Sequence, residues 1–292
     1  MRKLILTLIL AAGAAVGAQA QLLYKVSGNG LERPSYMFGT HHMAPLAMVD
    51  SVKGTRQALQ DADRVVGEID MTVGQMALAA KLQPMMLAPS DSTLTRLIGA
   101  EKMAGLEKEF ANWTPMPGLT LGALDVMKPA CVTQMVIVGV MGKKVPGFNP
   151  QEQLDSWFQE QAKNAGKKII ALETPEQQGE LLYCTLPLAK QAEAMVKLLE
   201  NPDEAVEEAE SLNAAYFSRD LDRMDALSRE SSDTPEFYEA MLLARNRAWL
   251  AELPEILKQG SNFIAVGALH LAGADGLVAQ LRKMGYTVEA VN

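Results

Sequence analysis

Short runs of β-branched or alternating apolar residues lie mainly towards the two ends of the chain. Runs of this length and composition predict β-strands. Six segments fit the pattern: residues 22–28, 35–39, 64–70, 167–173, 262–268 and 286–291. Most of the predicted sheet therefore comes from the N- and C-terminal parts of the chain.

In the middle of the chain, apolar residues recur at the spacing of a helix face. The predicted helices cover residues 50–61, 90–112, 151–165 and nearly all of 175–260. An apolar segment at 132–142 is too short to cross a bilayer. We expect a buried helix there, in which Met135 and Met141 fill gaps between larger side chains.

The whole pattern predicts an α/β fold of the α+β kind. A central mixed β-sheet is formed by the N- and C-terminal segments, and a long, mostly helical insertion separates them. The last thirty residues show this most clearly, with a strand at 262–267, a helix across 273–285 and a strand at 286–291. This order predicts a β-α-β-like unit, and Gly285 stands where a glycine commonly ends a helix.

The first twenty residues have the layout of a secretory signal peptide. Arg2 and Lys3 precede an apolar run, which ends in the small-residue pattern Ala18-Gln19-Ala20. A membrane anchor is the less favoured alternative, because the apolar run is short and lacks a charged stop. We therefore expect cleavage near Ala20, and a single exported domain at 21–292, periplasmic or secreted, without a membrane span.

The charge of the chain excludes one class of partner. The formal net charge is −8, and Lys and Arg residues are scattered among acidic residues instead of forming a basic block. We therefore expect no binding to nucleic acid, and the same charge pattern disfavours binding to a membrane surface.

Cys131 and Cys184 are the only cysteines of the chain. In an oxidising compartment they could form one disulfide, and two buried free thiols are the alternative. A zinc site built from cysteines is not expected, because the chain has no Cys-x-x-Cys motif and no cysteine near a histidine.

Each of the three histidines follows a predicted strand and a glycine. The motif Gly-x-x-His occurs at Gly39 to His42 and at Gly267 to His270, and His41 precedes His42. Ligands of α/β sheets bind beyond the carboxyl ends of strands, and a glycine there permits a sharp turn or a close approach. Because adjacent residues of an extended chain face opposite ways, at most one of His41 and His42 is expected to face the site.

Carboxylates occupy matching places after two strands. Glu68 closes one apolar strand, Asp70 would share its face if that strand continued, and Glu173 follows another strand. A buried carboxylate is usually paired or bound to a metal. His42, His270 and Glu68 are therefore candidate ligands of a divalent metal with an open position for water. Without a metal, the same residues could supply a general base and an orienting carboxylate.

The order of these motifs resembles that of a known family. The segments LLYKVSGNGLERPSYMFGTHHM, ADRVVGEIDM, IIALETPEQQ, YEAMLLARNRAWL and FIAVGALHLAGADGLVAQLRKMGYTVEAV are similar to the TraB/GumN family, in the order that the family shows them. That family is grouped with Tiki metalloproteases and erythromycin esterases. The similarity covers almost the whole chain after the leader.

The resemblance implies which residues form the site. It assigns the two motif histidines to His42 and His270 and the strand-end acid to Glu68. The arginine near the same pocket would be Arg245, and the Glu-Thr-x-x-x-Gln segment would supply Glu173 and Gln178. The guanidinium would bind a substrate carboxylate or stabilise an oxyanion. His41 departs from the family, whose members usually carry an apolar residue there.

Three functions follow as hypotheses. The first is a hydrolase of the TraB/GumN type that cleaves peptide bonds with a divalent metal such as Zn, Mn or Co, with Glu68, Glu173 and Arg245 as catalytic candidates. The second is a metal-free esterase-like hydrolase acting on a small molecule. The third is a non-enzymatic exported protein that binds a peptide, polysaccharide or signal. The chain has no HExxH, Gly-x-Ser-x-Gly, P-loop or dinucleotide motif, which disfavours those enzyme classes.

Overall fold

A mixed sheet of six strands joins the two ends of the chain in the computed structural model, which describes residues 21–231 and 235–291. The strands are β1 (Leu23–Gly28), β2 (Ser35–Thr40), β3 (Arg64–Gly67), β4 (Lys168–Ala171), β5 (Asn262–Gly267) and β6 (Tyr286–Ala290). Their order across the sheet is β4-β3-β5-β2-β1-β6. All six predicted strands are present, which confirms the predicted fold class. The predicted signal peptide lies outside the described residues, so export and cleavage stay predictions.

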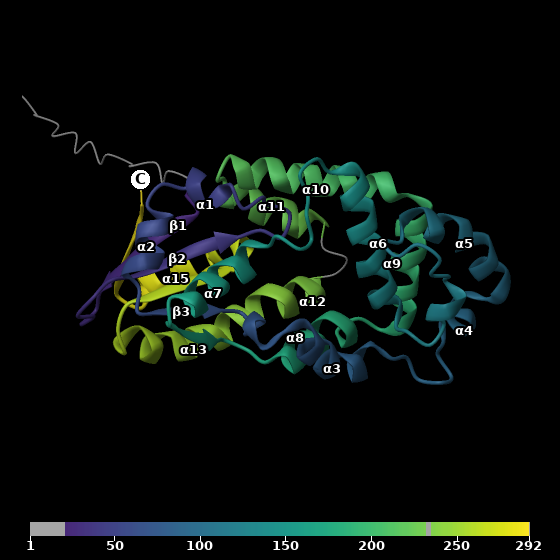
Figure 1. Ribbon diagram of the computed structural model, residues 1–292, viewed down its shortest axis with the longest axis horizontal. Helices are drawn as coiled ribbons and strands as arrows, with labels where there is room; N and C mark the ends of the chain where they lie inside the picture. The colour runs from purple at the N-terminus through teal and green to yellow at the C-terminus, as the bar shows by residue number, and fades with distance from the viewer. Residues whose placement is uncertain (1–20, 232–234, 292) are drawn as a thin grey trace, which may run out of the picture.

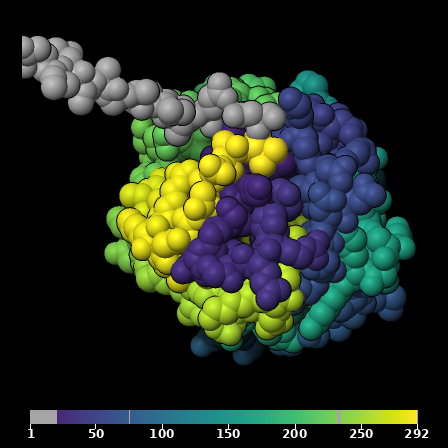
Figure 2. Space-filling view, turned by 90° about the vertical axis from the view of Figure 1, so that its left-hand side faces the viewer, coloured from purple at the N-terminus to yellow at the C-terminus, as the bar shows by residue number. Residues whose placement is uncertain are grey.

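Strand direction brings the carboxyl ends of four neighbouring strands to one edge of the sheet. β2 and β3 both pair in parallel with β5, and β4 pairs in parallel with β3. β1 is antiparallel to β2 and to β6, so the first and last strands are neighbours. Figure 2 shows the result, with N-terminal residues in purple beside C-terminal residues in yellow on one face. The segments after β2, β3, β4 and β5 therefore leave the sheet at the same edge.

Helices make up most of the remaining described chain. Those of the first half are α1 (Met48–Ser51), α2 (Thr55–Asp61), α3 (Gln75–Met86), α4 (Leu94–Ile98), α5 (Ala100–Trp113), α6 (Pro129–Lys144) and α7 (Leu154–Asn164). Those of the second half are α8 (Pro175–Cys184), α9 (Leu188–Glu200), α10 (Pro202–Phe217), α11 (Leu221–Ser231), α12 (Pro235–Tyr238), α13 (Arg245–Lys258), α14 (Ala268–Leu271) and α15 (Leu277–Lys283). Short 3-10 turns lie at Met71–Val73 and Gly122–Leu124, and one π-helical turn spans Glu239–Ala244.

Two of the predicted helices are interrupted. Gly54 separates α1 from α2, and Gly99 separates α4 from α5. Their φ angles of +85° and +86° lie in the left-handed region, where an α-helix cannot continue and glycine is favoured. Helix α3 was not predicted, because its apolar residues do not form one stripe, and Met76 is 89% exposed.

The side chains form two hydrophobic clusters. The first surrounds the sheet and includes Phe38, Phe158 and Trp249. The second lies among α4, α5, α6, α9 and the first half of α10 and includes Phe110. Figure 1 shows the sheet at one end of the long axis and α4, α5, α6 and α9 at the other. Helix α10 links the clusters, with Val206 in the second and Ala215 and Tyr216 in the first. A single domain stays a prediction.

The apolar segment at 132–142 forms the buried middle of α6. Val136 and Val140 are fully buried and Met141 is 2% exposed, whereas Met135 packs against the second cluster while partly exposed. The prediction of a buried helix is confirmed. Among residues 21–231 and 235–291, no helix is both long and apolar enough to cross a bilayer.

The predicted β-α-β-like unit at the C-terminus is present as β5, α15 and β6. The two strands run parallel but are not neighbours, because β2 and β1 lie between them. Gly285 follows the end of α15 with a φ of +91°, as a helix-ending glycine does.

Both cysteines are free thiols. Cys131 is buried near the Met86 carbonyl, at 3.6 Å, and burial raises its pKa to about 12. Cys184 is exposed, and its Sγ accepts a hydrogen bond from Lys128 Nζ at 3.0 Å. The structure therefore has free thiols, as one of the two alternatives held, but only one of them is buried.

Candidate functional site

Parallel pairing of the strands places two carboxylates side by side. Glu68 follows β3 directly, and its backbone oxygen accepts a hydrogen bond from the Glu173 N–H at 2.9 Å, beyond β4. On the other side, Oε1 of Glu68 accepts the Gly267 N–H at 2.8 Å, at the end of β5. The ladder thus holds Glu68 between the ends of β4 and β5.

Arg245 joins these carboxylates. It is the first residue of α13, directly after the π-helical turn, a feature that often occurs at functional sites. Its Nη2 donates to Glu68 Oε2 and to Glu173 Oε1, each at 2.5 Å, and its Nε donates to Glu173 Oε2 at 3.1 Å. Gln178 Nε2 donates to Glu173 Oε1 at 3.1 Å. The Arg245 side chain is only 9% exposed, so these charges are shielded from water.

His270 is held between Asn246 and Arg245. Its Nδ1 lies 2.7 Å from Asn246 Oδ1, and the Asn246 amide nitrogen donates to the backbone oxygens of His270 and Asp275. Because Oδ1 can only accept, Nδ1 carries the proton, and the lone pair of Nε2 accepts from Arg245 Nη1 at 3.0 Å. Burial lowers the pKa of His270 to about 3, so the imidazole is neutral at physiological pH. We call Glu68, Glu173, Gln178, Arg245 and His270 the Arg245 cluster.

Glu68 is ionised within this cluster. Burial would raise its pKa, but the attraction of His270 and Arg245 and the hydrogen bond from Gly267 outweigh burial and lower the pKa to about 2. His270 is neutral at physiological pH, so at that pH Arg245 and the hydrogen bonds are the groups that keep Glu68 ionised.

His41 and His42 point to different surroundings. His41 Nε2 lies 2.6 Å from Asn213 Oδ1 on α10, and its ring packs on Tyr216 at 5.0 Å between centroids. Burial lowers the pKa of His41 to about 4. His42 is exposed and lines a solvent-open cavity of about 750 Å³. The cavity walls also include Glu68, Asp155, Gln159, Gln178 and Arg245. Of the two adjacent histidines, only His42 lines this cavity.

Asp155 is a residue of this cavity that the sequence did not reveal. It lies in the first turn of α7 and is 9% exposed. Its Oδ1 accepts a hydrogen bond from Thr40 Oγ1 at 2.7 Å, whereas its Oδ2 has no hydrogen-bond partner among the described residues. Burial raises its pKa to about 6. An acid in the first turn of a helix is common, so its position in the sequence gave no signal.

A comparison with protein families places the whole fold in one family. The model of the TraB/PrgY/gumN family matches residues 22–290. The chain belongs to this family. No curated protein and no solved structure matches it. The resemblance inferred from the strand-end motifs is therefore confirmed, over nearly the whole chain.

In this TraB/PrgY/gumN family protein, the predicted metal ligands do not fit one shared metal ion. Both ring nitrogens of His270 are engaged, one by Asn246 and the other by the Arg245 guanidinium, which also contacts Glu68. A cation between His270 and Glu68 would therefore meet a positive charge. Among the described residues, no group of three or more His, Cys, Asp or Glu side chains is arranged to hold a metal. Metal binding stays a prediction.

Other predicted positions have structural roles. β3 ends at Gly67, so Asp70 does not share a strand face with Glu68; its Oδ1 caps the next turn by accepting from Thr72 N at 2.8 Å. A Cβ at Gly39 would lie 3.0 Å from Ala268, which is tighter than most Cβ contacts and favours glycine there. A Cβ at Gly267 would make an ordinary 3.4 Å contact with Glu68, so this glycine matters through its N–H.

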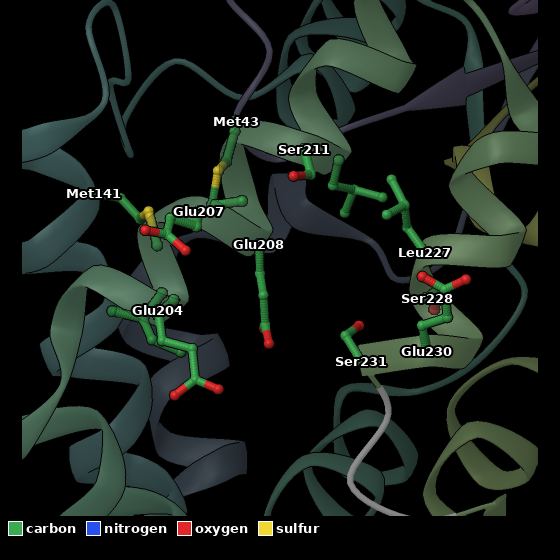
Figure 3. Close-up of a pocket in the computed structure, with 14 residues that line it drawn as sticks. Met43, Met141, Glu204, Glu207, Glu208, Ser211, Leu227, Ser228, Glu230 and Ser231 are labelled. Atoms are coloured by element: carbon green, nitrogen blue, oxygen red, sulfur yellow. The ribbon is translucent and has the colours of Figure 1, made fainter.

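A second hollow lies beside the His42 loop, between α6, α10 and α11 (Figure 3). It has a volume of about 1200 Å³, open to solvent, and Met43 and Met141 line it. Its charged lining residues are glutamates, of which Glu204 pairs with Lys197. No histidine lines it and no residue of the Arg245 cluster reaches it, so the candidate site is the smaller cavity at His42.

Proposed function

We propose that this TraB/PrgY/gumN family protein is a hydrolase that cleaves ester or peptide bonds in the cavity lined by His42 and Glu68. The observation that carries the proposal is that the exposed imidazole of His42 shares this cavity with a buried, charged cluster whose geometry is fully constrained. Preorganised charge beside a titratable base is typical of sites that activate water.

The hydrogen bonds of Arg245 define its role. Its five N–H groups donate to Glu68, Glu173 twice, His270 and the Met241 carbonyl. No N–H group is left for a substrate. Arg245 therefore holds the two carboxylates in place, which differs from the substrate or oxyanion contact that the family resemblance implied.

In the proposed reaction, a water molecule binds between His42 and Glu68. His42 takes a proton from this water while its oxygen forms a bond to the carbonyl carbon of the substrate. The tetrahedral oxyanion formed in this way then re-forms the carbonyl and breaks the C–O or C–N bond to the leaving group, which receives the proton from the same imidazole. Glu68, ionised and held by Arg245 and Gly267, orients the water. These steps use only side chains of this chain and correspond to the metal-free hypothesis.

The test is a hydrolysis screen after treatment with a chelator. Protein treated with EDTA and then dialysed is assayed against chromogenic esters and a fluorogenic peptide library, alone and with Zn, Mn or Co restored. The proposal predicts hydrolysis without metal. Activity only in the metal-restored samples would instead support metal-dependent peptide cleavage, and binding without turnover in any sample would support the non-enzymatic alternative.

We also propose that the protein is exported to the periplasm or secreted. The support is the leader at residues 1–20, with its basic start, apolar run and Ala18-Gln19-Ala20 end. Edman sequencing of the full-length protein expressed in a bacterium tests this directly. A new N-terminus near Gln21 in the exported fraction is expected, and an uncleaved chain in the cytoplasm would contradict it.

A further inference from the structure

Asp155 is anchored to the segment that carries His42. Thr40, two residues before His42, donates its hydroxyl proton to Asp155 Oδ1 at 2.7 Å, and both partners are buried. This bond connects the end of β2 with the first turn of α7, which lie 115 residues apart in the chain. The contact fixes the carboxylate in the wall of the cavity that His42 also lines.

The second oxygen of Asp155 is an unused acceptor. Oδ2 is buried and has no partner among the described residues. An ionised carboxylate that is 91% buried costs stability unless both oxygens are satisfied, so a free oxygen at a cavity wall indicates a group that binds there.

The other polar groups of the cavity are committed elsewhere. Gln159 accepts from Met71 N and donates to Ile69 O, each at 2.9 Å, and Gln178 donates to the carboxylates of Glu68 and Glu173. All N–H groups of Arg245 are used. Of the polar residues that line the cavity, only His42 and Gln153 have side chains without a hydrogen bond within the described part of the chain. Of these two residues, His42 is the better donor to Asp155 on grounds of charge. Burial raises the pKa of Asp155, and the attraction of His42 is the main effect that lowers it.

We propose that Asp155 is the positioning residue for His42, and that its Oδ2 accepts a hydrogen bond from the His42 imidazole. This inference deepens the proposed hydrolase function and rests on it for its chemical meaning. One ring N–H of His42 would bind Asp155, and the lone pair of the other nitrogen would face the cavity as the base. When His42 takes a proton from water, the Asp155 carboxylate stabilises the imidazolium.

The test measures which ring nitrogen of His42 carries the proton. The chain has only three histidines, so nitrogen-15 long-range NMR spectra of the labelled protein contain three ring systems, assigned with single His→Gln variants. Spectra are recorded at about pH 8, above the pKa of about 6 of Asp155, so that its carboxylate is ionised. One dominant His42 tautomer is expected in the unmodified protein.

Asp155→Asn is the decisive variant. Its Oδ1 can keep the bond from Thr40, which places an NH₂ donor where the acceptor Oδ2 was. The His42 tautomer is expected to change to a mixture or to the opposite form. Glu152→Gln removes an exposed carboxylate three residues away and should leave His42 unchanged. Unchanged His41 and His270 signals verify the fold of each variant.

The same His42 tautomer in the unmodified protein and in Asp155→Asn would overturn the inference. This is also the result expected if Gln153, and not His42, donates to Asp155 Oδ2, because His42 would then not sense the substitution. This result does not depend on turnover, so it is distinguishable from a failure of the hydrolysis screen. If hydrolysis is found, Asp155→Asn should lower kcat more than it changes KM, since the carboxylate acts through His42.

Discussion

Arg245 Nη1 donates to the unprotonated Nε2 of His270 at 3.0 Å, so the second motif histidine supports the guanidinium instead of facing the cavity. The first motif histidine, His42, is exposed and lines the cavity. The two Gly-x-x-His motifs are alike in sequence, but the structure gives them different surroundings. His270 belongs to the buried Arg245 cluster, whereas His42 lies at the surface of the cavity.

Removal of the Arg245 charge should destabilise the fold. Arg245→Gln leaves Glu68 and Glu173 buried without their counter-charge, and breaking a buried pair in this way costs about 3–5 kcal/mol. Urea unfolding of both proteins measures the difference. Arg247→Gln, two residues away on the exposed side, removes the same charge and should change stability little. Equal stability of the two variants would contradict the structural role of Arg245.

Asp155→Asn should stabilise the protein in a pH-dependent way. The pKa of Asp155 rises from 3.8 to about 6 on folding, so the stability that its protonated form contributes is present below pH 3.8 and lost as the pH rises through 6. The free energy of unfolding of the variant should exceed that of the unmodified protein by up to about 3 kcal/mol above pH 6, and by less towards pH 4. Urea unfolding across this range measures it, and a difference independent of pH would contradict the raised pKa.

The partly buried His41 and the buried His270 should destabilise the fold in acid. The pKa values of His41 and His270 fall from 6.5 to about 4 and about 3, so their contribution is present above pH 6.5 and lost as the pH falls towards those values. His270→Asn should therefore flatten the loss of stability between pH 6.5 and 4. NMR titration of His270 provides the direct measurement, and a midpoint near 6.5 would show that its imidazole is not held neutral.

The two motif glycines should respond differently to alanine. At Gly39 a Cβ would lie 3.0 Å from both Cα and Cβ of Ala268, and forcing extra atoms into a packed site costs about 1–3 kcal/mol. At Gly267 the nearest contact would be an ordinary 3.4 Å. Thermal unfolding should thus show a larger loss for Gly39→Ala than for Gly267→Ala. The reverse order would contradict the described packing.

The sequence predicted the sheet and half of the site, because both depend on local pattern. Glu68, Glu173, His42 and His270 are all placed by strand ends, which alternating apolar runs reveal. Asp155 and Asn246 could not be found in this way. Their partners, Thr40 and His270, lie on other elements, and only the folded chain brings each pair into contact.

The hydrogen bonds of Arg245 favour another role than the family resemblance implied, for a related reason. A guanidinium near a pocket suggests contact with a substrate, and the resemblance to the TraB/GumN family favoured that interpretation. The number of acceptors around an arginine depends on tertiary structure, which a sequence pattern does not encode. Here the acceptors of Glu68, Glu173, Met241 and His270 use every N–H group.

The most direct test of the proposed site compares the two adjacent histidines. Each is replaced by glutamine, and the hydrolysis rate is measured on whichever ester or peptide the screen identifies. His42→Gln removes the base and should lower kcat by about 10²–10⁴. His41→Gln, whose ring faces Asn213 and Tyr216 outside the cavity, should retain activity. Full activity in His42→Gln, or an equal loss in both variants, would contradict the assignment of the site to this cavity.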